Sequence, residues 1–157
     1  MNDLLRILAG EWTGAGAGEY PTITSFEYLE TLRFTLDETS DGLQYEQRTQ
    51  RRVMDGDDYI PSHRESGSLS LLPDNRVKLS NTQLGGREEV LMGTIEAAPV
   101  GLVLRLYSTH LANDLRMEAT TRTITVNGDT LHYTMFMQTN KVPHLAIHLE
   151  ATLQRQK

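Results

Sequence analysis

Hydrophobic and polar residues alternate along most of this chain with the period of two that is typical of β-strands. The clearest alternation covers residues 26–36, where one face carries Phe26, Tyr28, Leu32, Phe34 and Leu36. Glu30 falls on the same face and is its one polar member. Residues 102–109 repeat the pattern with Leu102, Leu104 and Leu106. The alternation therefore predicts strands that bury one side and expose the other.

Turn-forming residues divide the chain into short segments. Asn127-Gly128 is the strongest of these signals, because this dipeptide favours the tight turn of a β-hairpin. Besides residues 26–36, strands are expected at residues 44–52, 66–72, 76–81, 88–96, 102–109, 116–126, 130–138 and 148–154. With the segment that follows Gly10, the sequence predicts about ten strands.

One short helix is expected at the N-terminus, over residues 3–9. Its apolar stripe consists of Leu4, Leu5, Ile7 and Leu8, and Gly10 can end it. Ten sequential hairpin-connected strands favour an all-β fold, an antiparallel up-and-down barrel like those of lipocalins and fatty-acid-binding proteins. Trp12 is expected to pack against the helix where it plugs the barrel. More than about eight strands leave room for a cavity, so we expect a ligand inside.

Composition narrows the classes of function. The length of 157 residues predicts one domain spanning residues 1–157. The absence of cysteine excludes disulfides, thiolate metal sites and cysteine nucleophiles. A net charge of −6 without a basic stripe argues against nucleic acid and membrane surfaces as partners. Neither a signal peptide nor an apolar run of about 18 residues is recognisable, so a cytoplasmic protein is expected.

Gly14, Gly16 and Gly18 remove three side chains from one face of the first strand. They lack the strand–loop–helix context of a phosphate-binding loop. Period-two glycines either let a strand bend or let a flat ligand approach the backbone, and both interpretations stay open. The five histidines form no zinc-binding pattern, and no serine lies in a Gly-x-Ser-x-Gly elbow. Zinc and hydrolase chemistry therefore have no support.

Several motifs occur in an order that is more specific than any one of them. Residues 10–16 are Gly-Glu-Trp-Thr-Gly-Ala-Gly, and residues 18–23 are Gly-Glu-Tyr-Pro-Thr-Ile. Residues 63–67 are His-Arg-Glu-Ser-Gly, and residues 148–153 are His-Leu-Glu-Ala-Thr-Leu. Over nearly its whole length the chain resembles the nitrobindin family of haem-binding β-barrels.

This resemblance implies a ten-stranded barrel that holds haem b near one mouth. It implies His148 as the axial iron ligand, His63 as a pocket residue and Thr22 as a haem contact. Gly14 and Gly16 would lie beside the macrocycle. Members of the family bind nitric oxide and are similar to peroxynitrite isomerases, which convert peroxynitrite to nitrate. A monomer or homodimer without nucleic-acid or membrane partners is expected.

The sequence departs from the family at two places. Residues 37–42 are Asp-Glu-Thr-Ser-Asp-Gly instead of a His-x-Gly-Lys-Pro stretch, which would alter the electrostatics of the mouth if this loop lies there. Residues 143–148 form a segment one residue longer than usual. Alternation places Leu149, Ala151 and Leu153 on the core face and His148 on the other. If the extra residue lies in the loop, His148 still points inward, and if it lies in the strand, the ligand is lost. An inward His148 requires either the opposite orientation at that end of the strand or a bulge that re-aims it.

Two other functions remain open at this point. One is a non-enzymatic carrier of a fatty acid or another small apolar ligand. Such a carrier needs an interior arginine to pair with a carboxylate, and Arg48, Arg116 and Arg122 are the candidates. The other is an interaction domain in which the barrel is only a scaffold. A Soret band on addition of haem distinguishes the haem-binding hypothesis from the carrier.

Overall fold

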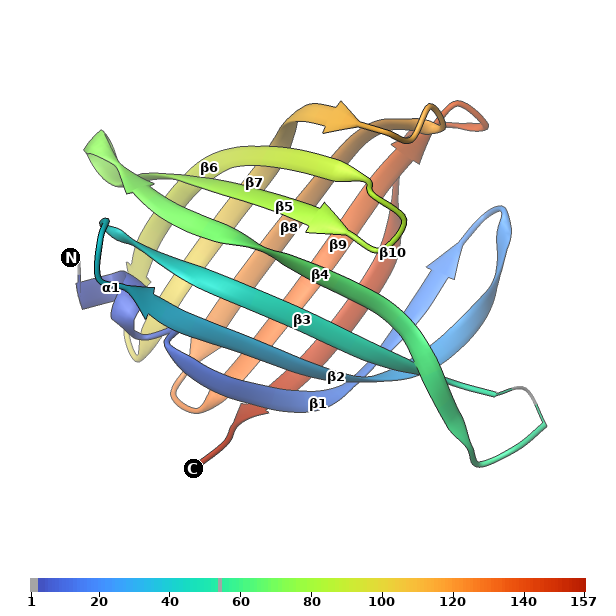
Figure 1. Cartoon of the computed structure of the whole chain (residues 1–157), viewed down its shortest axis with the longest axis horizontal. Helices are drawn as coiled ribbons and strands as arrows, with labels where there is room; N and C mark the ends of the chain where they lie inside the picture. Colours follow the sequence, from blue (N-terminus) through green and yellow to red (C-terminus); the bar gives the residue numbers. More distant parts are fainter. Residues whose placement is uncertain (1–2, 54) are drawn as a thin grey trace.

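Ten antiparallel strands follow a short helix and close into a barrel in the computed structural model, which describes residues 3–53 and 55–157 (Figure 1). Each strand pairs with its neighbours in the sequence, and β1 pairs with β10 to close the sheet. The predicted up-and-down barrel of about ten strands is confirmed. Closure gives every strand a partner on both sides and leaves no open edge.

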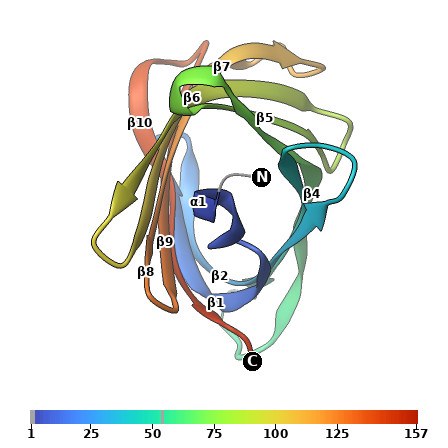
Figure 2. The same cartoon turned by 90° about the vertical axis from the view of Figure 1, so that its left-hand side faces the viewer.

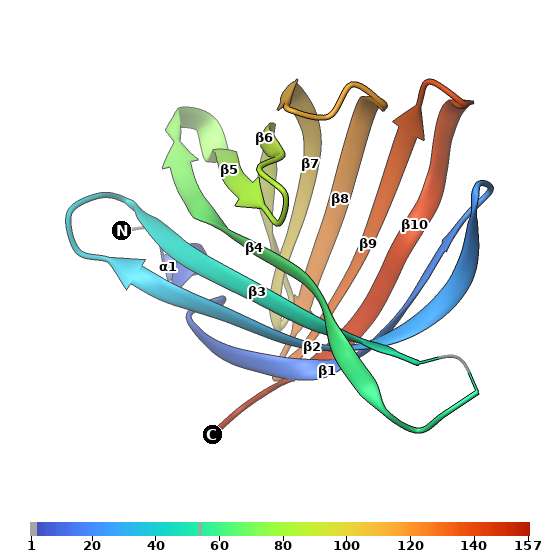
Figure 3. The same ribbon diagram turned by 45° about the vertical axis from the view of Figure 1, so that its right-hand side comes forward.

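The strands are β1 (Gly10–Tyr20), β2 (Ile23–Asp37), β3 (Gly42–Arg52), β4 (Tyr59–Leu72), β5 (Arg76–Gln83), β6 (Glu88–Ala98), β7 (Gly101–Ala112), β8 (Met117–Asn127), β9 (Thr130–Thr139) and β10 (Val142–Arg155); a 3-10 turn, η1 (Pro73–Asn75), joins β4 to β5. Most strands begin within three residues of the predicted position, but β4 and β10 begin at least six residues earlier, at Tyr59 and Val142. The early part of β4 belongs to a β3–β4 hairpin that projects past the barrel (Figure 3), so the core imposes no alternation on it.

The helix α1 (Asp3–Arg6) is shorter than the predicted residues 3–9. The amides of Ile7, Leu8 and Ala9 donate to carbonyls only three residues back, at 3.2, 3.1 and 3.1 Å, which tightens the last turn. Gly10 then turns the chain into β1 with a φ of +123°. In the described part of the chain, no helix is long and apolar enough to span a membrane.

This N-terminal segment lies across one end of the barrel (Figure 2). Trp12 is fully buried beneath it, and its indole Nε1 donates to the carbonyl of Leu8 at 2.9 Å. The Arg155 guanidinium lies 4.2 Å from the centre of the Trp12 ring. The interior around this end is apolar and includes the fully buried Leu5, Leu8, Leu43, Leu69, Leu102 and Leu131. The helix therefore plugs this end of the barrel as expected.

The connections alternate between the two ends, as they must in an up-and-down barrel. The β1–β2, β3–β4 and β9–β10 turns lie away from α1 and surround the open mouth (Figure 1). The acidic β2–β3 turn lies at the α1 end instead. There Asp37 accepts hydrogen bonds from Thr39, and these bonds hold the pKa of its carboxyl well below the usual range. These carboxylates therefore do not border the mouth.

Candidate functional site

A cavity of about 210 Å³ lies in the half of the barrel nearer the mouth. It is lined by Phe26, Tyr28, Gln47, Thr49, Ser62, His63, Glu65, Gln83, Arg87, Met135, His148 and Leu149. The wall combines apolar and aromatic side chains with two histidines, an arginine, a glutamate and several neutral polar side chains. Such a mixture is typical of a small-molecule site in which a few polar groups orient the ligand.

His148 reaches this cavity through a β-bulge in β10. Ile147 pairs with Phe136 of β9 and Leu149 pairs with Met135, so His148 is an extra residue between two consecutive pairs. The bulge lets His148 and Leu149 line the same cavity although they are adjacent in sequence. Simple alternation would have turned one of them outward. The bulge that an inward His148 needs is thus present.

The imidazole of His148 is held in one tautomer. Its Nδ1 lies 3.1 Å from the backbone carbonyl of Glu19 in β1. A carbonyl only accepts hydrogen bonds, so Nδ1 carries the proton and Nε2 keeps its lone pair. Burial lowers the pKa of His148, and the nearby Arg87 and His63 lower it further, against the opposing effect of the Glu19 bond. A neutral imidazole oriented by a carbonyl is the form in which histidine binds metals.

His63 lines the same cavity but is held differently. Its Nε2 lies 3.4 Å from the Glu65 carboxylate, so this nitrogen carries the proton. Burial by itself raises the pKa of Glu65, but the Arg122 charge and the hydrogen bonds from His63, Arg122 and Tyr45 outweigh burial and hold it well below the usual range. The Nε2 of His63 is therefore engaged by a carboxylate, whereas the Nε2 of His148 is available.

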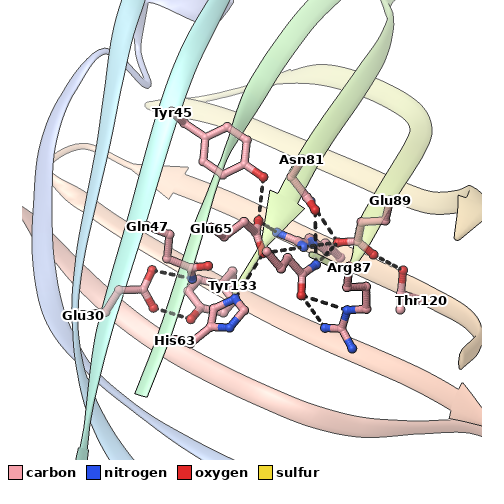
Figure 4. Close-up of polar contacts among 12 residues, drawn as sticks. Glu30, Tyr45, Gln47, His63, Glu65, Asn81, Arg87, Glu89, Thr120 and Tyr133 are labelled. Atoms are coloured by element: carbon pink, nitrogen blue, oxygen red, sulfur yellow. Dashed lines mark hydrogen bonds and ion pairs between the residues drawn. The ribbon is translucent and has the colours of Figure 1, made fainter. Parts of the chain in front are cut away.

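A buried ionic cluster stands behind His63 (Figure 4). Arg122 of β8 donates to Glu65 at 2.7 and 3.2 Å and also to Glu89. Glu89 accepts further bonds from Asn81 at 2.9 Å, Gln83 at 3.1 Å and Thr120 at 2.8 Å. Since burial of an unpaired charge is costly, this dense pairing is what makes the cluster tolerable inside the barrel.

The same cluster bears on the fatty-acid carrier. Arg122 is interior, but two glutamates already neutralise its guanidinium. Arg48 and Arg116 lie on the outside, paired with Glu46 and Asp114. None of these three candidate arginines is therefore an interior cation available for a fatty-acid carboxylate.

Arg87, which the sequence patterns did not single out, is the cation that lines the cavity. It follows the β5–β6 turn, where no alternation identifies an inward position. Its Nε donates to Gln83 at 2.9 Å, and its Nη1 lies 3.5 Å from Asp114. Its side chain remains 27% exposed, so it can still reach an anion at the mouth.

Thr22, Gly14 and Gly16 do not belong to the residues that line this cavity. Thr22 is exposed in the β1–β2 turn at the mouth, three residues after Glu19. The flat group over Gly16 is the ring of Tyr28, whose Cζ lies 2.5 Å from where a Cβ would stand. At Gly14 a Cβ would meet the backbone of β10. These glycines admit neighbouring strands and rings of the protein itself.

Together, a closed barrel and an internal cavity with an oriented neutral histidine define a small-molecule-binding β-barrel. Residues 2–155 match the family described as THAP4-like, heme-binding beta-barrel domain. The chain belongs to this family, in agreement with its resemblance to nitrobindin.

Curated relatives and solved structures agree with this assignment. "Peroxynitrite isomerase 2" of Mycobacterium ulcerans is 35% identical over 156 residues, which cover 98% of this chain and 93% of the relative. "Peroxynitrite isomerase" of Nocardia farcinica is 36% identical over 154 residues, 96% of this chain and 88% of the relative. The crystal structure of Rv2717c from M. tuberculosis superposes with a TM-score of 0.88 at 34% identity, covering 99% and 96% of the two chains.

Proposed function

We propose that this protein holds haem b in the mouth cavity with His148 as the axial ligand of ferric iron, and that it converts peroxynitrite to nitrate or binds nitric oxide there. The observation that carries the proposal is the His148 bulge, because it aims a neutral imidazole with a free Nε2 into the cavity. The peroxynitrite isomerases among the relatives support the choice of reaction.

The remaining lining residues fit a haem. Phe26, Met135 and Leu149 provide apolar surface for a flat macrocycle, and Arg87 provides a cation for its carboxylates. The cavity of about 210 Å³ is smaller than the roughly 300–1,000 Å³ of typical ligand sites. To hold a haem, the cavity would therefore have to widen at the mouth or by movement of a lining side chain.

When bound, the haem iron supplies the Lewis-acid and redox chemistry of the isomerisation. The protein supplies ligation, orientation and limited access. His148 provides the nitrogen ligand, and the Glu19 carbonyl fixes its orientation. His63, held by Glu65, presents a polar group to the same cavity. No protein nucleophile is required, in keeping with a chain that carries no cysteine.

A haem titration tests the ligation. Ferric haem added to the purified protein is expected to give the Soret band of a histidine-ligated haem, and His148→Ala is expected to abolish it. His144→Ala is the matched control, because His144 lies in the same strand but is exposed. Added imidazole should restore the spectrum of His148→Gly by filling the vacated position. A wild-type spectrum in His148→Ala would refute the proposed ligand.

A second measurement separates His63 from His148. His63→Ala should keep the axial bond and its spectrum while changing the affinity for nitric oxide and the ratio of nitrate to nitrite formed from peroxynitrite. The reason is that His63 lines the cavity but has its Nε2 bound to Glu65. Loss of the histidine-ligated spectrum in His63→Ala would show that the two roles were assigned to the wrong residues.

A further inference from the structure

A buried carboxyl group stands directly behind the cavity wall and touches the cavity only through other side chains. Glu30 of β2 is 3% exposed. One of its oxygens accepts a hydrogen bond from the hydroxyl of Tyr133, and the other accepts from Gln47 at 3.0 Å (Figure 4). The Tyr133 hydroxyl lies 2.7 Å from that of Tyr28. Tyr28 and Gln47 both line the cavity.

We propose that Glu30, Tyr133 and Tyr28 form a proton relay that delivers a proton to an anionic oxygen ligand in the cavity. Tyr28 is the group that faces the ligand, and Glu30 acts through the two tyrosines. The relay deepens the proposed function, since peroxynitrite is such a ligand. Its hydrogen bonds exist without haem, however, so the two proposals can fail separately.

The direction of the hydrogen bonds depends on the protonation of Glu30. When Glu30 is a carboxylate, Tyr133 donates to it and Tyr28 donates to Tyr133, so Tyr28 offers the cavity only a lone pair. When Glu30 is protonated, it donates to Tyr133, Tyr133 donates to Tyr28, and the Tyr28 hydroxyl points its hydrogen at the ligand. If that hydrogen passes to the ligand, Tyr28 takes a proton from Tyr133, and Tyr133 takes one from Glu30. The only net change in the protein is that Glu30 becomes a carboxylate.

The surroundings of Glu30 suit it to this exchange near neutral pH. Burial raises its pKa to about 7, although the bonds from Tyr133 and Gln47 oppose the rise. The charged groups that face it are Glu65 from β4, which raises the pKa further, and Arg122 from β8, which lowers it. Its neighbour on β1 is Gly14, which adds no titratable group. Arg122 keeps Glu65 ionised, so of these two carboxyls Glu30 is the one that changes charge near neutral pH.

Infrared spectroscopy of the haem-free protein tests the relay itself. The C=O stretch of a buried carboxylic acid should disappear with a midpoint near pH 7 and be absent from Glu30→Gln. The C–O stretches of isotope-labelled tyrosine should shift at the same midpoint, because both hydroxyls reverse direction. Tyr28→Phe should remove part of that tyrosine shift while keeping the carboxylic acid band. Tyrosine bands that stay constant while Glu30 titrates would overturn the relay.

Fluoride binding to the haem-loaded ferric protein tests delivery to a ligand, because fluoride stays anionic across this range and accepts hydrogen bonds. Its affinity should rise on the order of tenfold from about pH 8 to about pH 6, the value of one charge-assisted hydrogen bond. Glu30→Gln and Tyr28→Phe should each remove most of this rise. Tyr45→Phe is the matched control, since Tyr45 is also buried and donates to a carboxylate, Glu65, outside the relay.

The outcomes distinguish the two proposals. A histidine-ligated haem spectrum together with an unchanged fluoride pH profile in Tyr28→Phe overturns the relay and leaves the haem site intact. Failure to bind haem, together with coupled carboxyl and tyrosine bands in the haem-free protein, overturns the proposed function and supports the relay. Tyr28→Phe retains Glu30 and its two hydrogen-bond donors, so the test does not depend on whether Glu30→Gln folds.

Discussion

The two halves of the barrel interior differ in how they are held together. The half under α1 is filled by leucines and Trp12, whereas the half near the mouth contains the buried acidic and basic side chains Glu30, Glu65, Glu89 and Arg122. The same strand supplies both, since β2 contributes Phe34 and Leu32 to one half and Glu30 and Tyr28 to the other. Apolar burial needs no particular partner, but each buried charge needs one at a defined place. The positions of side chains are therefore constrained more closely in the mouth half than in the apolar half.

Within the mouth half, two glutamates show opposite behaviour. Glu65 has a cationic partner in Arg122 and stays ionised. Glu30 receives hydrogen bonds from neutral groups, and burial dominates its pKa. The comparison shows that the charge of the partner, and not depth alone, decides whether an interior carboxyl is fixed or titrates near neutral pH.

Arg122→Met gives the largest expected effect, because it leaves the carboxylates of Glu65 and Glu89 without their shared cation. Breaking a buried ion pair on one side costs about 3–5 kcal/mol of the free energy of unfolding. Denaturant unfolding should show this loss at about pH 8 and a smaller one at about pH 5, since protonation relieves the uncompensated charges. Arg105→Met is the control, because its bridge to Glu96 is exposed. A loss below 1 kcal/mol at both pH values would contradict the prediction.

Leu5→Ala tests the apolar half. Leu5 is fully buried in α1, and alanine preserves helix propensity, so the substitution removes packing alone. The expected loss is about 2–5 kcal/mol in denaturant unfolding. Arg6→Ala, on the exposed side of the same helix, should change stability little. Haem uptake by Leu5→Ala should match wild type, and impaired uptake would show that the two halves are not independent.

Glu30→Gln should change the pH dependence of stability. In the wild type, folding raises the pKa of Glu30 from 4.5 to about 7, so unfolding releases a proton between these values and stability falls as pH rises. That pKa shift corresponds to a loss of about 3 kcal/mol in the free energy of unfolding of the wild type, and the loss is complete above about pH 7. Glu30→Gln lacks this contribution. Between about pH 5 and about pH 8, the free energy of unfolding of the variant should therefore rise relative to that of the wild type. If urea unfolding gives the same difference in free energy of unfolding between wild type and Glu30→Gln at every pH, the raised pKa of Glu30 is contradicted.

His148→Ala should have the smallest effect on stability. His148 is the extra residue of a bulge at the mouth, so its truncation removes little buried apolar surface. We expect a loss of at most about 1 kcal/mol and an unchanged far-ultraviolet circular dichroism spectrum, alongside the loss of haem ligation. A loss of several kcal/mol would make His148 a structural residue of the mouth half.

The sequence by itself determined the barrel. Alternation, turn residues and the Asn127-Gly128 hairpin are local signals, and an up-and-down barrel pairs segments that are adjacent in the chain. Glu30 was visible as the one polar residue on the apolar face of residues 26–36, but alternation alone did not reveal the polar half of the interior around it. The family motifs added His148 and His63, but local periodicity placed His148 on the outer face.

Only the tertiary structure decided where His148 points and which charges meet. The bulge exists because β9 and β10 pair with one residue left over, which the sequence of β10 alone does not reveal. Glu65 and Arg122 are 57 residues apart, and Glu30 and Tyr133 are 103 apart. Arg87 reaches the cavity from a turn without periodicity. Such contacts arise across the barrel, where closure of the sheet brings distant strands face to face and local patterns carry no information about the partner.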